Sequence, residues 1–101
     1  MIVSRWQAPL VPGEKQITAM FEAEGLLPLR ETFEPGQKVE DHRHPFDEVR
    51  MVVGGEMMMS VAGNKLLLRS GDKIIIPSNT KHSMEAHGTE TCLCIISKKP
   101  S

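Results

Sequence analysis

Short apolar segments separated by turn residues run along most of the chain. Glycine, proline, asparagine and serine recur at short intervals and leave pieces of about six to ten residues. Pieces of this length suit strands better than helices, and several are rich in β-branched or long apolar side chains. The predicted strands cover residues 26–34, 48–53, 56–61, 65–69, 73–76 and 91–97.

Residues 15–24 also alternate imperfectly between apolar and polar positions, so we predict a further strand there. No segment sustains a 3.6-residue period, and the most helix that we expect is a short turn near Trp6. Gly54-Gly55 and Gly63-Asn64 have the residue types that tight hairpin turns require. Many short strands joined by regular turns predict an all-β fold, either an antiparallel sandwich or a closed barrel.

Length and charge narrow the range of functions. A chain of 101 residues has the size of one domain with one modest core, which leaves no room for a second catalytic domain. Its formal net charge of -1 creates no field that would attract a polyanion, so we expect no nucleic-acid partner. No apolar run reaches the roughly 20 residues of a membrane-spanning helix, and we expect no membrane partner.

The N-terminus lacks the basic start, apolar stretch and cleavage site of a secretory signal, so we expect a cytoplasmic protein. Cys92 and Cys94 lie two residues apart in a predicted strand, where side chains at this spacing run roughly parallel. That geometry is poor for a disulfide, and we favour two buried thiols over a metal or redox role.

Three of the four histidines form a pattern with a carboxylate. On an extended segment the even spacing of His42, His44 and Glu48 places all three on one face. His82 comes from a distant segment, which a closed barrel can bring alongside. Three nitrogen ligands and one oxygen ligand suit a divalent transition metal such as Mn, Fe, Co, Ni or Zn, whereas Ca and Mg prefer all-oxygen sites.

The spacing of these residues resembles the two signature motifs of the cupin superfamily. The first motif is carried by Gly36, His42, His44, Glu48 and Gly55, and the second by Gly71, Pro77, Asn79 and His82. Asn79 stands where the pattern usually has glycine, but asparagine tolerates a left-handed φ, so the turn should survive. Ala86 replaces an asparagine that commonly ends the second motif, and all four ligand positions are intact.

The resemblance implies a double-stranded β-helix, or jelly-roll barrel, which we place at residues 15–98 with a tail at 99–101. It implies that His42, His44, Glu48 and His82 bind one divalent transition metal ion at one end of the cavity. Similar small proteins often form homodimers through edge strands. We therefore expect a homodimer, to which the N-terminal arm, residues 1–14, could contribute a contact.

Arg50 should face the cavity together with Glu48, because the two residues lie on the same strand at even spacing. It could bind a carboxylate or phosphate of a substrate. The alternatives are an ion pair with Glu34, Glu56 or another acid, or a bend that turns the side chain outward.

Three more residues are candidate substrate contacts. Phe46 could cap the cavity mouth or simply pack. Met57 and Met59 could line the pocket, although packing is the more common role of methionine. His87 lies five residues after His82, on the opposite face of a strand, and we expect it to face solvent or the other sheet.

Two functions fit these observations. The first is a metal-dependent enzyme of the dioxygenase, isomerase, lyase or decarboxylase class that acts on a small polar or carboxylate-bearing metabolite. The second is a non-catalytic protein in which the metal helps to bind a sugar or an organic acid. We favour the enzyme because the ligand set leaves coordination sites open. A second titratable group in the cavity would strengthen that choice.

Overall fold

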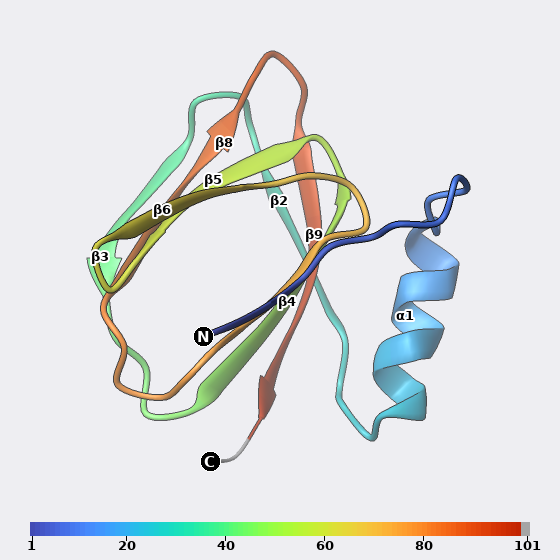
Figure 1. The fold of residues 1–101 in the computed structure, drawn as a ribbon, viewed down its shortest axis with the longest axis horizontal. Helices are drawn as coiled ribbons and strands as arrows, with labels where there is room; N and C mark the ends of the chain where they lie inside the picture. The colour runs from blue at the N-terminus through green and yellow to red at the C-terminus, as the bar shows by residue number, and fades with distance from the viewer. Residues whose placement is uncertain (100–101) are drawn as a thin grey trace.

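Two antiparallel sheets face each other across the interior of the molecule (Figure 1). The computed structural model describes residues 1–99. One sheet has the order β1 (Ile2–Ser4), β7 (Lys73–Ile76), β4 (Asp47–Gly54), β9 (Cys92–Lys99) and β2 (Leu29–Phe33). The other has the order β3 (Lys38–His42), β8 (His82–His87), β5 (Glu56–Val61) and β6 (Asn64–Leu68). This arrangement confirms the predicted all-β jelly-roll fold.

The single helix within residues 1–99, α1 (Glu14–Ala23), corrects the strand predicted at 15–24. Its two buried residues, Ile17 and Phe21, are four positions apart and therefore lie on one face of a helix. At its start the backbone N–H of Gly13 donates to the side-chain oxygen of Gln16 at 2.9 Å. With only two apolar anchors, the helical period was too weak to separate from imperfect alternation.

The helix covers the outer face of the five-stranded sheet, against β4 and β9 (Figure 1). Ile17 and Phe21 pack there in a small core of their own with Val49, Met51 and Ile95. Covering this face matters for the site, because it keeps both sides of β4 buried.

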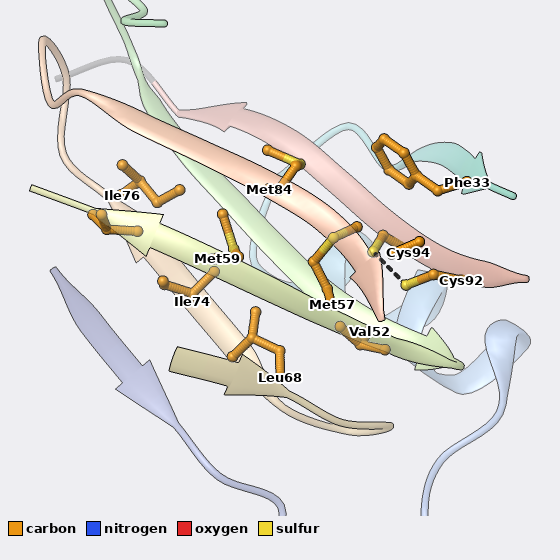
Figure 2. Close-up of a cluster of buried hydrophobic side chains, with 12 residues drawn as sticks. Phe33, Val52, Met57, Met59, Leu68, Ile74, Ile76, Met84, Cys92 and Cys94 are labelled. Carbon is orange, nitrogen blue, oxygen red and sulfur yellow. Dashed lines mark hydrogen bonds between the residues drawn. The ribbon is translucent and has the colours of Figure 1, made fainter. Parts of the chain in front are cut away.

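The main core fills the space between the two sheets (Figure 2). Met57 and Met59 from β5 and Leu68 from β6 are fully buried there. Cys92 and Cys94 are also fully buried free thiols, with their sulfur atoms 3.9 Å apart. Figure 2 marks this contact with a dashed line. The prediction of two buried thiols is confirmed.

Two turns differ from the sequence prediction. Gly54-Gly55 is not a hairpin, because β4 and β5 belong to different sheets. Gly55 has a φ of +74°, and a Cβ there would lie 2.6 Å from the carbonyl oxygen of Thr91, so glycine is required for both conformation and space. The β5–β6 hairpin turns at Ala62-Gly63, one residue earlier than predicted. Asn79 has a φ of +59°, which confirms that asparagine supports the left-handed turn.

The N-terminal residues form part of the sheet of their own chain. Ile2–Ser4 pair antiparallel with β7, and residues 14–23 of the segment that follows form α1. At the other end, Lys99 belongs to β9, while residues 100 and 101 of the predicted tail lie outside the described residues. None of the helical residues within 1–99 makes a segment long and apolar enough to cross a bilayer.

Candidate metal centre

The four predicted ligands meet at one end of the barrel although they come from three strands and a loop. His42 is the last residue of β3 and pairs in register with His82, the first residue of β8. His44 lies in the loop that follows β3, and Glu48 is the second residue of β4 in the opposite sheet. The site therefore spans the gap between the two sheets.

Hydrogen bonds between the two motif loops hold these residues together. The backbone N–H of Asn79 donates to the carbonyl oxygen of His44 at 2.6 Å. The backbone N–H of Ser78 donates to a carboxylate oxygen of Asp47 at 2.8 Å, and the Arg43 guanidinium donates to the Asn79 carbonyl at 3.0 Å. The left-handed turn at Asn79 is thus placed directly behind His44.

The three histidines present their side chains to one point. One ring nitrogen from each of His42, His44 and His82 lies within 4.8 Å of the other two. The Nδ1 atoms of His42 and His82 lie 2.8 Å from the backbone carbonyls of Glu40 and Thr80. Because a carbonyl only accepts, these Nδ1 atoms carry the hydrogen, and each Nε2 keeps its lone pair for a ligand.

The lone pair on the Nε2 atom of His82 lacks a partner in the described part of the chain. The residue is 1% exposed, and its Nε2 has no hydrogen-bond partner within residues 1–99. A buried polar atom left in this state costs about 1–3 kcal/mol. An electron-pair acceptor, such as a metal ion, placed among the three rings would remove that cost, so the residues present fit a metal ion.

Glu48 stands beside the histidines. Its carboxylate Oε1 lies 3.5 Å from His44 Nε2 and 3.9 Å from His82 Nε2. Burial lowers the pKa of His44, as do the neighbouring His42 and His82, and the Glu48 charge opposes this only in part. His44 is therefore neutral near neutral pH, which is the protonation state that binds a metal.

Arg50 is buried between two acids. Its side chain is 2% exposed, with Nε 3.2 Å from Glu48 Oε2 and a terminal nitrogen 2.7 Å from Glu31 Oε1. Of the roles considered from the sequence, the structure shows the internal ion pair, with Glu31 and Glu48 as its acids instead of Glu34 or Glu56. The positive charge of Arg50 is thus paired inside the barrel, and it offsets the charge of one of the two carboxylates.

A cavity of about 150 Å³ opens beside the candidate metal ligands. The Phe46 ring is stacked on His44 at 4.7 Å between centroids, and the Lys98 ammonium lies 5.0 Å from the Phe46 ring centre. The cavity is lined by Leu29, Glu31, His44, Phe46, Glu48, Ile96, Ser97 and Lys98. Phe46 therefore packs against His44 and lines the cavity, and its role as a cap over the cavity mouth stays a prediction.

Sequence reasoning missed the lining residues from β2 and β9. In register, Ile96 pairs with both Leu29 and Arg50, and Lys98 pairs with Glu48. The alternation within each strand was visible in the sequence, but which strands flank β4 was not. Met57 and Met59, in contrast, are packed in the core and do not line this cavity, and His87 is exposed as expected.

A family model for the cupin domain matches residues 29–97, which is more than half of the chain. The chain belongs to the cupin family. This cupin also resembles solved structures. A search of curated proteins, by comparison, found no match.

One similar structure is Drosophila melanogaster CENP-C bound to CAL1, with a TM-score of 0.66 and 20% identity over 71% of this chain and 60% of that one. Another is an RmlC-like cupin from Shewanella frigidimarina, with a TM-score of 0.67 and 25% identity over 75% and 67%. A third is oxalate oxidase, with a TM-score of 0.67 and 24% identity over 76% and 43%. An enzyme and a protein-bound domain thus share the fold of this cupin.

Proposed function

We propose that this cupin binds one divalent transition metal ion through His42, His44, His82 and Glu48, and uses it to convert a small carboxylate-bearing metabolite. The observation that carries the proposal is the buried His82 Nε2, which has no partner within residues 1–99 although three ring nitrogens converge on one point. Three nitrogens and one oxygen favour Mn, Fe, Co, Ni or Zn.

The cavity beside these ligands supports a small anionic substrate. Its volume of about 150 Å³ corresponds to about five water molecules, so it suits a compound of only a few heavy atoms. Glu31 and Glu48 both line the cavity, and the charge of Arg50 offsets one of these two carboxylates. A bound divalent ion and the Lys98 ammonium would then make the total charge of the site positive. A carboxylate is the common metabolite group that matches this charge, and Leu29, Phe46 and Ile96 offer apolar contacts to its carbon atoms.

The metal, when bound, would act as a Lewis acid on a substrate oxygen. The histidines and Glu48 would hold it, and Phe46 and Lys98 would orient the substrate at the cavity wall. Glu31 supports an enzyme over a binding protein, because it is a titratable group that lines the cavity and is not one of the ligands. The dioxygenase, isomerase, lyase and decarboxylase classes all remain within this proposal.

A second candidate function is metal-assisted binding without catalysis. The pairing of Glu31 with Arg50 at 2.7 Å favours it, because a carboxylate engaged in an internal ion pair is less available to act on a substrate. The variant Glu31→Gln separates the two functions. Loss of turnover with retained ligand affinity in Glu31→Gln supports the enzyme. A wild type that binds the ligand without turning it over, with the same binding in Glu31→Gln, supports the binding protein.

The metal site is tested by elemental analysis of protein purified without chelator or affinity tag. We expect about one transition metal ion per chain in the wild type, and loss of that metal in His42→Ala and His82→Ala. The matched control is His87→Ala, which removes an exposed histidine from the same strand as His82 and should keep the metal. Equal trace metal in all four proteins would contradict the proposed site.

The substrate class is tested with the neighbouring lysines Lys98 and Lys99, of which only Lys98 lines the cavity. We expect Lys98→Met to weaken binding of small carboxylates to the metal-loaded protein several-fold, measured by calorimetry, and Lys99→Met to leave it unchanged. A cytoplasmic location and a homodimer also remain predictions.

A further inference from the structure

Arg50 is among the largest fully buried side chains of the molecule and the only charged one of them in the described chain. A buried guanidinium is expensive unless its charge is paired, and apolar replacements of buried ion pairs often fold equally well or better. Stability alone is therefore a weak explanation for an arginine here. Its position next to Glu48, a proposed metal ligand, suggests a second explanation for an arginine here.

The two ion pairs of Arg50 differ in geometry. The Nε atom donates a hydrogen bond to Glu48 Oε2 at 3.2 Å. The terminal nitrogen lies 2.7 Å from Glu31 Oε1, yet neither of these two atoms has a hydrogen bond of correct angle within residues 1–99. The contact with Glu31 is therefore a close charge pair, while the directional bond of Arg50 goes to Glu48.

The directional bond divides the two oxygens of Glu48 between different neighbours. Oε2 is taken by Arg50, and Oε1 faces the ring nitrogens of His44 and His82 at 3.5 and 3.9 Å. A carboxylate held in this way offers one oxygen, in a fixed direction, to an ion among the histidines. Without Arg50, the carboxylate would be free to turn towards Lys98, which faces it across the β4–β9 pair.

We propose that Arg50 is a positioning residue that fixes Glu48 as a one-oxygen ligand of the metal. The inference rests on the proposed function, because it requires metal at this site. Arg50 acts through Glu48 and is not placed in contact with the metal or the substrate. It thus provides the outer support that metal-binding carboxylates commonly need.

Zinc affinity in a double-mutant cycle tests this coupling. We expect Arg50→Met to lower the affinity for Zn²⁺ by about 10–100-fold. In a Glu48→Ala background, the same substitution should change the affinity by less than about threefold, because the group that Arg50 positions is gone. Arg30→Met is the matched control, since it removes an exposed guanidinium that pairs with Glu14 at 2.9 Å, and it should leave the affinity unchanged.

A variant that keeps the buried charge separates positioning from charge balance. Arg50→Lys retains a cation but loses the planar donor group, and it leaves neither acid without a positive neighbour. We expect it to fold and to shift the visible absorption of the Co²⁺-loaded protein, which reports the coordination of the ion. A wild-type spectrum and wild-type zinc affinity in Arg50→Lys would overturn the inference.

The outcomes distinguish this inference from the proposed function. If the wild type binds zinc but Arg50→Met lowers the affinity equally with and without Glu48, only the inference fails. If the wild type binds no transition metal, both fail. A rise in affinity in Arg50→Met would also overturn the inference, because Arg50 would then be a competing cation.

One measurement on the wild type needs no substitution. The other four arginines of the chain are exposed, so only the Nε–H of Arg50 should exchange slowly with solvent in a ¹⁵N NMR spectrum. We expect its signal to persist, with a changed chemical shift, when zinc is added. Loss of protection on zinc binding would mean that Glu48 leaves Arg50 to bind the ion, and would overturn the inference.

Discussion

Asp72 and Glu48 are both 6% exposed, but their surroundings satisfy them very differently. Asp72 accepts hydrogen bonds from the backbone N–H groups of Arg69 at 2.9 Å and Trp6 at 3.1 Å, and from the Arg5 guanidinium at 2.7 Å. Both of its oxygens are occupied by donors from the protein itself. It joins the N-terminal segment to the turn before β7.

Glu48 receives one hydrogen bond, from Arg50, and its other oxygen lies 3.9 Å from the His82 Nε2, which carries a lone pair. Two acceptors facing each other at 3.9 Å gain nothing unless a proton or a cation lies between them. The comparison shows that burial alone does not identify a functional carboxylate. The distinguishing feature is whether its neighbours are donors or further acceptors.

Removal of the fully satisfied carboxylate should produce the largest effect on stability. In Asp72→Ala, three donors lose their acceptor, and we expect the free energy of unfolding to fall by about 3 kcal/mol, or the melting temperature by about 12–24 °C. Metal content should remain at the wild-type value. Thermal unfolding and elemental analysis measure these two quantities. A folded Asp72→Ala protein without metal would contradict the distinction between a structural Asp72 and a metal-site Glu48.

Metal binding at the site around Glu48 should stabilise the fold by slightly less than the free energy that Asp72→Ala is expected to lose. At a free metal concentration of about 100 times the dissociation constant, we expect a gain of about 2.7 kcal/mol over chelator-treated protein. Denaturant unfolding with and without metal should show this gain in the wild type and in Asp72→Ala. His82→Ala should show no gain, and an equal gain in that variant would place the metal elsewhere.

Protonation of Asp72 in acid should change the free energy of unfolding by less than Asp72→Ala or metal binding does. Burial by itself raises the pKa of Asp72, but hydrogen bonds from Arg69, Arg5 and Trp6 outweigh it and lower that pKa below its ordinary value. The ionised carboxylate therefore stabilises the fold above the unfolded-state pKa of about 3.9, and this contribution is lost as the pH falls through the lower folded-state pKa.

Unfolding of the metal-free protein between pH 6 and pH 2 checks the expected sign. The wild type should lose more stability on acidification than Asp72→Asn, which has no carboxylate to protonate. Equal slopes in the two proteins would show that Asp72 has the same pKa in the folded and unfolded states.

Most of the strands could be predicted from local sequence, and the set of four proposed ligands from even spacing together with the resemblance to the two cupin motifs. His42, His44 and Glu48 share a face through even spacing, and Asn79 supports its turn because asparagine tolerates a positive φ. The helix at Glu14–Ala23 was missed because only Ile17 and Phe21 mark its buried face. The Gly54-Gly55 crossover was mistaken for a hairpin because glycine marks both kinds of turn.

What the sequence by itself determined is which residues of most strands alternate inward and that His42, His44 and Glu48 share one face, because both depend on spacing within one segment. Only the tertiary structure decided that Glu31 pairs with Arg50, that Lys98 faces Glu48, and that Asp72 binds the N-terminal segment. Those contacts join residues 19 to 66 positions apart in the chain, and strand order in an antiparallel barrel is set by packing over the whole core, which no local pattern encodes.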